Sequence, residues 1–177
     1  MHESVREFLG RLKLQHPDVF HGRVAEFGSF IINGTPRGLF DGQEYVGIDW
    51  RPGPGVSVIS LAHAYDPGDT RFDTIVSTSM LEHDPHWDRS LRNMVRLLRP
   101  GGSMILTCAG PGFHKHELET APSGDGHASG TYYRNLSAVE ILAEINTSRF
   151  DRIVAEDDVE NHDTRIFLYK KIEEAKC

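Results

Sequence analysis

"FDTIVSTSMLEHDPHWDRSLRNMVRLLRPGGSMILTC", residues 72–108, is the stretch of this sequence that decides the fold. It begins and ends with short apolar runs, residues 72–77 and 103–108, each of the length of a buried strand. Between these runs, apolar residues recur at helical spacing, at Trp87, Leu91, Met94, Val95 and Leu98. The stretch therefore predicts a strand, a helix and a second strand.

Helix signals mark both ends of the segment between the two runs. Asp84 is a favourable N-cap, and Pro85 fits the first helical position because its missing N–H has no intrahelical partner there. The run Arg99-Pro100-Gly101-Gly102 is typical of a helix end. A helix that joins two adjacent strands in this way favours parallel pairing.

The rest of the chain repeats this alternation. Strand-like runs are predicted at residues 23–27, 45–49, 56–60, 149–155 and 164–170. Helices are predicted over residues 4–14, where Ser4 and Glu7 match a capping box, and after Ser137, which matches a second box with Glu140. We therefore expect an α/β fold with a doubly wound, mostly parallel sheet and helices on both faces. A single domain over residues 1–177 is expected, with an N-terminal helical segment in residues 1–20.

Composition excludes several classes of function. The chain has 26 acidic and 19 basic residues and a formal net charge of -7, which argues against a general affinity for nucleic acid. Its two cysteines lack the spacing of a disulfide framework or a metal-binding pair. No apolar run is long enough for a membrane span, and the N-terminus does not resemble a signal peptide. We expect a soluble, cytoplasmic protein.

Two carboxylates stand at the ends of the first two predicted strands. Glu26 precedes a turn over residues 28–34, and Asp49 ends the next strand. A carboxylate in the position of Asp49 can accept hydrogen bonds from both ribose hydroxyls, and Trp50 offers a flat face for adenine. The negative charge of Glu26 suits a cationic amino group. The alternative is purely structural: a strand must turn, Asp49 begins a loop, and Trp50 packs.

These segments together resemble a known family. The succession "RVAEFGSFIINGTPR", "YVGIDWRPGPGVSVI" and residues 72–108 resembles class I S-adenosylmethionine-dependent methyltransferases, of the small-molecule type with LEH and RPGG motifs. The resemblance implies seven strands with the last one antiparallel, and S-adenosylmethionine as cofactor. It also implies transfer of a methyl group to a small or medium-sized acceptor.

The resemblance assigns the methionine end of the cofactor to the first turn. Glu26, Gly28 and Ser29 are expected to line the methionine moiety, while Asn33 and Gly34 shape the turn beneath it. Phe30-Ile31-Ile32 replace the later small residues of the usual glycine-rich turn, so we expect a wider and more apolar turn here.

The same resemblance assigns the adenosine end to the next two loops. Asp49 is expected to hold the ribose, Trp50 to lie against adenine, and Ala62 and His63 to contact adenine through the backbone. Leu61 stands where an acidic or amide residue often contacts the adenine amino group, so stacking and backbone bonds are expected to dominate. The floor near the sulfonium would be formed by Ser79, Met80, Glu82 and His83.

The sequence offers fewer motifs for the residues that would bind the methyl acceptor. His83 is the candidate base for a protonated acceptor, with the alternative that it only orders its turn by bonding a backbone carbonyl. Residues 109–134 form a long predicted substrate-side loop. The candidate substrate-binding residues are His114, Tyr132, Tyr133 and Arg134, the last as partner of an anionic group.

Two other functions stay open. The first is a module that binds the cofactor but is catalytically idle or depends on a partner; a homo-oligomer or partner could also complete the active site. The second is a metal-dependent enzyme that uses the histidines at positions 83, 114, 116 and 127, although their spacing is not diagnostic of a metal site. Our preferred interpretation assigns no metal.

Overall fold

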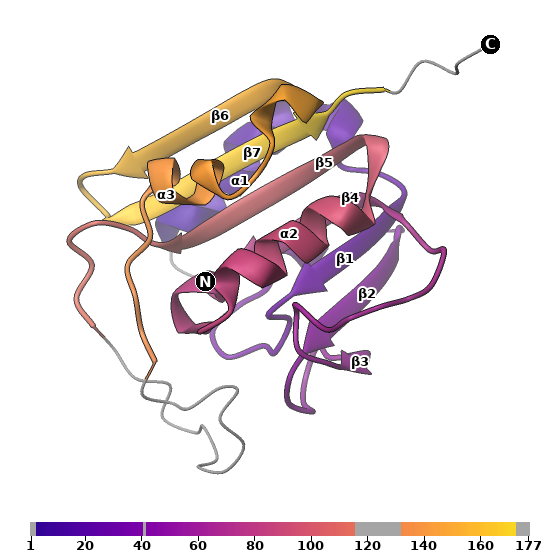
Figure 1. The fold of residues 1–177 in the computed structure, drawn as a ribbon, viewed down its shortest axis with the longest axis horizontal. Coiled ribbons are helices and arrows are strands. Elements are labelled where there is room, and N and C mark those ends of the chain that lie inside the picture. Colours follow the sequence, from indigo (N-terminus) through magenta and orange to yellow (C-terminus); the bar gives the residue numbers. More distant parts are fainter. Residues whose placement is uncertain (1–2, 41, 116–131, 173–177) are drawn as a thin grey trace.

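The computed structural model describes residues 3–40, 42–115 and 132–172. They form a seven-stranded sheet in the order β3-β2-β1-β4-β5-β7-β6 (Figure 1). The strands are β1 (Arg23–Phe27), β2 (Glu44–Asp49), β3 (Val58–Ile59), β4 (Phe72–Thr78), β5 (Leu98–Ala109), β6 (Phe150–Asp158) and β7 (Asp163–Lys170). β7 is antiparallel to both of its neighbours and every other pair is parallel, which confirms the expected doubly wound fold.

Helices cover both faces of the sheet, as expected. In Figure 1, α1 (Glu3–Gln15) lies behind the sheet, and α2 (Trp87–Leu97) and α3 (Ala138–Ala143) lie in front of it. The buried face of α1 packs with Val24, Val76 and Ile105 of the strands. α2 packs against alternate residues of the same strands, such as Ala25 and Ile75. The alternation follows from the strand period of two, which sends successive side chains to opposite faces.

The boundaries of α2 differ from the prediction. The helix begins at Trp87 rather than after Asp84, and its first i to i+4 bond joins Ser90 N to His86 O at 2.9 Å. The Asp84 side chain still caps this end, because it accepts the His86 N–H at 2.8 Å. At the other end, Leu98 already pairs with Phe72 of β4, so the RPGG run belongs to the start of β5.

One of the two predicted capping boxes is confirmed. Ser137 Oγ accepts from Glu140 N at 3.3 Å and Ser137 N donates to Glu140 at 2.9 Å, at the start of α3. The predicted box at Ser4 is wrong. Ser4 lies inside α1, and its hydroxyl donates to Asp163 of β7 at 2.5 Å, so a tertiary contact replaces the local one.

The connection from β1 to β2 has little regular secondary structure in its described residues. A helix usually follows each strand of a doubly wound sheet, yet the described residues between these strands contain only a 3-10 turn, η2 (Arg37–Phe40). Further short 3-10 turns are η1 (Pro17–Val19), η3 (Leu81–His83) and η4 (Thr147–Arg149). None of the helices in the described residues has the length and apolar character that a membrane span requires.

Candidate active site

The carboxyl ends of three parallel strands meet at one edge of the sheet. Phe27 of β1 pairs with Ile48 of β2 on one side and with Ser77 of β4 on the other. The turns that follow these strands therefore lie side by side, which is where ligands of open α/β sheets bind. They carry most of the residues that the sequence assigned to the cofactor.

The turns after β1 and β4 touch each other at Gly28. Its φ of +79° is in the left-handed region, and a Cβ added there would lie 2.6 Å from the Met80 Cβ. Gly28 N also donates to Ile48 O at 2.9 Å. Ser79, which precedes Met80, has a φ of +53° and donates its N–H to Thr107 O at 2.9 Å. Glycine at position 28 is thus required by both conformation and space.

Asp49 is held by the backbone around it. It is 8% exposed, and its two carboxylate oxygens accept from Phe30 N at 3.1 Å and from Arg51 N at 3.2 Å. Burial raises the pKa of Asp49, and these amides partly offset that effect. Each carboxylate oxygen has a second lone pair, so the fixed carboxylate keeps capacity for two hydroxyl donors.

Glu26 is buried next to a cation that the sequence analysis did not identify. It is 3% exposed, and its Oε2 lies 3.7 Å from Arg37 Nε. Burial raises the pKa of Glu26 to about 7, while Tyr45 and Arg37 act in the opposite direction. Arg37 and Tyr45 come from η2 and β2, and no local pattern in the sequence links them to Glu26.

The first turn packs against the loop after β2. A Cβ at Gly53 would lie 2.0 Å from the Phe30 ring, and the Arg51 guanidinium lies 3.9 Å from the centroid of that ring. Ile31 N donates to Pro54 O at 2.9 Å. Phe30 thus fills the space between the two loops, beside the Arg51 side chain, which also lies over the Trp50 ring at 5.6 Å. Asn33 and Gly34 are exposed at the far end of the turn.

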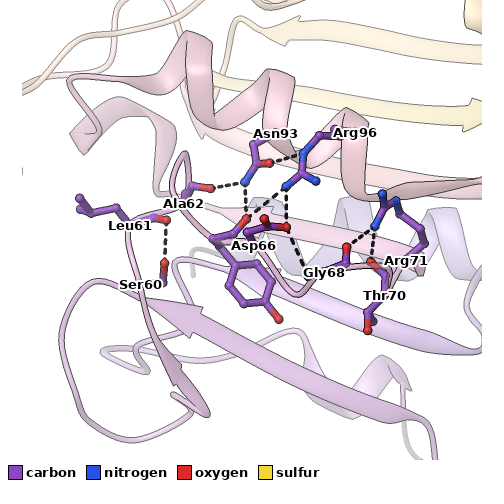
Figure 2. Close-up of polar contacts among 10 residues, drawn as sticks. Ser60, Leu61, Ala62, Asp66, Gly68, Thr70, Arg71, Asn93 and Arg96 are labelled. Atoms are coloured by element: carbon purple, nitrogen blue, oxygen red, sulfur yellow. Dashed lines mark hydrogen bonds and ion pairs between the residues drawn. The ribbon is translucent and has the colours of Figure 1, made fainter.

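The segment expected to contact adenine is fixed to α2 (Figure 2). Asn93 Nδ2 donates to Ala62 O at 2.8 Å and to Tyr65 O at 2.9 Å. Arg96 Nε donates to Asn93 Oδ1 at 3.0 Å, so the amide of Asn93 is oriented by its neighbour (Figure 2). His63, which follows Ala62 in the chain, packs edge-to-face on His86 with ring centroids 4.8 Å apart. Asn93 is therefore a positioning residue for this segment.

The structure brings several predicted acceptor-side residues together. The His83 and Tyr133 rings meet edge-to-face with centroids 5.4 Å apart, and the Tyr133 hydroxyl donates to His114 O at 3.4 Å. Arg134 pairs with Glu140 at 2.7 Å and lies over the Trp87 ring at 5.7 Å. Tyr132 lies near Arg134, and burial raises its pKa. His116 and His127 lie outside the described residues.

Beneath this group lies a second buried glutamate, Glu82. It is 2% exposed, and burial raises its pKa to about 7, against the opposing effect of the backbone N–H groups of Glu82 and Ala109. Its carbonyl accepts Arg134 N at 2.9 Å, which ties the acceptor-side segment to η3. Burial also raises the pKa of the neighbouring Cys108 thiol.

The metal alternative gains no support. Within residues 3–40, 42–115 and 132–172, no group of three or more His, Cys, Asp or Glu side chains is arranged to hold a metal ion. His83 and His114 belong to the aromatic group described above.

Comparison with known proteins gives a family match. The methyltransferase domain family matches residues 21–146, which include β1 to β5, α2 and α3. No curated protein sequence matches the chain significantly.

Solved structures with the same fold include both methyltransferases and a cyclase. A 1,6-didemethyltoxoflavin N1-methyltransferase of Burkholderia thailandensis, bound to its substrate and S-adenosylhomocysteine, is 16% identical with a TM-score of 0.58, over 90% of this chain and 76% of its own. The N-methyltransferase NodS of Bradyrhizobium japonicum, with S-adenosylhomocysteine, is 18% identical with a TM-score of 0.58, over 95% and 87%. The [4+2]-cyclase SpnF is 15% identical with a TM-score of 0.65, over 94% and 82%. At these identities the likeness establishes the fold.

Proposed function

Because this chain belongs to the methyltransferase domain family, we propose that it transfers a methyl group from S-adenosylmethionine to a small or medium-sized acceptor. The observation that carries the proposal is the shared edge of β1, β2 and β4. Two buried carboxylates, Glu26 and Asp49, stand there on either side of the turn at Gly28. Neighbours solved with S-adenosylhomocysteine support the same cofactor.

The residues at this edge fit such a cofactor. Gly28 lets the turn after β1 pack directly against Met80, because a side chain at position 28 would collide with it. Ser29 Oγ is a buried atom without a hydrogen-bond partner in the described residues, whereas Glu26 Oε2 lies 3.7 Å from Arg37 Nε. Asp49 would hold the ribose, with Trp50 and the backbone of Ala62 and His63 at the adenine, and the LEH and RPGG motifs would mark the small-molecule type.

The protein has little chemistry to add to methyl transfer. When bound, S-adenosylmethionine supplies a methyl group on a positively charged sulfur that is already a good leaving group. The chain's own residues bind and orient the reactants and exclude water. We assign this task on the acceptor side to residues 109–134 and, within the described part, to His114, Tyr132 and Tyr133. Arg134 would contribute only by exchanging Glu140 for an anionic group of the acceptor.

His83 is proposed as the base for an acceptor that must lose a proton. It is half-buried at the end of η3 and is oriented by the ring of Tyr133. With an acceptor identified by transfer of a labelled methyl group, His83→Gln should lower kcat about a hundredfold and remove the acidic limb of the pH profile. An unchanged pH profile would assign His83 to the ordering of its turn.

Binding is the first test of the proposal. Calorimetric titration with S-adenosylmethionine and S-adenosylhomocysteine should give micromolar affinity. Asp49→Ala should weaken it tenfold or more, because hydrogen bonds to a charged group are lost. Asp69→Ala, on the exposed connection between β3 and β4, is the matched control and should bind normally. Equal affinity of both variants would show that the ribose lies elsewhere.

A cofactor-binding module without methyl transfer is the second candidate. It is favoured by Phe30, which fills the space between the first turn and the loop after β2, and by SpnF, a [4+2]-cyclase with the same fold. This candidate predicts nucleoside binding without turnover. Native mass spectrometry with and without cofactor tests whether a second copy or a partner completes the site, because an active strict monomer excludes that option.

A further inference from the structure

The two edges of the sheet differ in length. β3, at one edge, has two residues, whereas β6, at the other edge, has nine. In Figure 1, β6 is the outermost strand, and no described element pairs with it on its outer side. Among the residues that the structure describes, no backbone group bonds to the outer side of residues 152–157. The N–H and C=O groups along such a long edge form a template for another strand.

The middle of β6 carries apolar side chains on both faces of the sheet. Ile153 is 41% exposed and Val154 is 40% exposed, and as neighbours in a strand they point to opposite faces. Ile153 lies opposite Leu168 of β7, and Val154 lies opposite Phe167. Both of these β7 residues are fully buried, so the β6 pair forms the outer rim of the core on each face. A further strand would cover this rim.

Two-fold symmetry limits how a second copy of β6 could pair with the first. In antiparallel pairing the axis is perpendicular to the sheet, and facing residues point to the same side, so one residue lies opposite its own copy. With Val154 on the axis, Ile153 lies opposite Ala155 of the second copy. Arg152 then lies opposite Glu156 of the second copy.

This register is the complementary one. Apolar residues meet in the middle of the paired segment, and opposite charges face each other on both sides of it. Placing Ile153 or Ala155 on the axis would instead set Val154 opposite a charged residue. The bulge between Phe150 and Arg152 lies before this segment, so residues 152–158 keep a regular strand geometry.

The two charged side chains are stable without a second copy. Arg152 Nη2 donates to Asp18 at 3.3 Å, and its guanidinium carbon lies 4.1 Å from the centroid of the Tyr169 ring. Glu156 accepts from Arg165 Nη1 at 3.4 Å and stays 47% exposed. Their opposite charges would therefore select the register, while backbone hydrogen bonds and apolar contacts would supply most of the affinity.

We propose that the outer side of β6 is an interface at which a second copy of this chain adds its own β6, antiparallel, with Val154 on the two-fold axis. The pairing joins two seven-stranded sheets into one. Because the axis reverses the strand direction, the carboxyl ends of β1, β2 and β4 in the two copies lie at opposite ends of the joined sheet. The interface adds no residue to either candidate active site, so the inference is independent of the proposed function.

Oligomeric state over a concentration series is the first test. Size-exclusion chromatography with light scattering should show the wild type passing from monomer to dimer as its concentration rises. Val154→Lys sets a charge opposite its own copy and should raise the dissociation constant of the dimer about tenfold or more. Ile59→Lys is the matched control, since Ile59 is 62% exposed on β3 at the opposite edge, and should leave the dissociation constant unchanged.

Engineered cysteines test the register. Facing residues of an antiparallel pair have Cα atoms about 4.5–5.5 Å apart, and diagonal neighbours about 7–8 Å apart. A disulfide requires a Cα separation below about 7 Å. In a Cys177→Ser background, in which the remaining Cys108 is buried, Val154→Cys should form an intermolecular disulfide under mild oxidation. Ile153→Cys should not, because its own copy is a diagonal neighbour.

The outcomes that contradict the inference are distinct. A wild type that stays monomeric at every concentration overturns it, and so does a dimer that Val154→Lys leaves intact. Equal cross-linking of the two cysteine variants overturns the register. If Val154→Lys does not fold, as judged by circular dichroism, the wild-type concentration series and the two cysteine variants decide. A dimer that binds no S-adenosylmethionine supports this inference and contradicts only the proposed function.

Discussion

Glu26 and Glu82 are both buried glutamates with a pKa raised to about 7, yet their surroundings differ. Glu26 faces Arg37 across a gap too long for a hydrogen bond, and hydroxyl groups lie nearby. Glu82 has no such cation: its pKa is lowered only by backbone N–H groups and is raised further by Asp163. The first glutamate has a cation beside it at the carboxyl edge of the sheet, and the second lies near the predicted acceptor-side residues with no cation among the described groups that shift its pKa.

The comparison shows that a raised pKa by itself does not identify a ligand-binding group. Burial alone accounts for most of the effect in both regions. What separates the two is the opposite charge of Arg37 beside Glu26, because Oε2 of both glutamates is buried without a hydrogen-bond partner in the described residues. Four measurements test this distinction and the turn beside Glu26.

The largest expected effect is a pH dependence of stability. Between pH 4.5 and about 7, the folded protein keeps a proton on Glu82 that the unfolded chain releases, so the free energy of unfolding falls as pH rises through this window. The contribution is full below pH 4.5 and amounts to about 3 kcal/mol across the window. Glu82→Gln should flatten this slope in urea titrations. A slope that survives in the variant would mean that Glu82 is ionised in the fold.

Glu26 should cause the same pH dependence of stability as Glu82, but only in the absence of ligand. Glu26→Gln should remove a similar slope from the free protein. Saturating S-adenosylhomocysteine should weaken the wild-type slope from Glu26, because a bound ammonium favours the ionised carboxylate, and should leave the slope from Glu82 in place. If ligand changed the slopes from Glu26 and Glu82 equally, the two glutamates would not differ in their relation to the ligand.

The next effect concerns the turn beside Glu26. Gly28→Ala should lower the free energy of unfolding by about 2 kcal/mol, because alanine is strained at a φ of +79° and its Cβ would meet Met80. Gly10→Ala in α1 is the control, since a Cβ there has no atom within 4 Å and should stabilise the helix by about 0.5–1 kcal/mol. Chemical denaturation of both variants measures the difference. Similar stabilities would show that the turn relaxes without cost.

The smallest effect is on affinity. Glu26→Gln keeps the shape of the side chain but removes its charge, and should weaken S-adenosylhomocysteine at pH 8 about tenfold, or about 1.4 kcal/mol. Glu82→Gln, the isosteric change in the other region, should bind within twofold of wild type. Isothermal titration calorimetry measures the affinity of both variants directly. A larger loss of affinity in Glu82→Gln than in Glu26→Gln would assign the ligand to the region of Glu82 instead.

The region of residues 72–108 shows how far sequence periodicity reaches. Its two strands and its helix were predicted because apolar spacing reports directly which face of an element is buried. The start of α2 was placed two residues too early relative to the structure. Asp84 and Pro85 are good N-terminal residues in isolation, but here they form a turn that precedes the helix. The Asp84 side chain caps the helix from this turn, because it accepts a hydrogen bond from His86 N.

The sequence by itself determined the order of strands and helices along the chain, the places where strands end, and hence the carboxylates Glu26 and Asp49 at the carboxyl edge of the sheet. These features depend on residues close together in the chain. Only the tertiary structure decided that Arg37 and Tyr45 face Glu26, that Asn93 fixes Ala62, and that Ser4 bonds Asp163 instead of capping a helix. Such contacts join segments far apart in sequence, and their geometry is set by how the sheet brings those segments together.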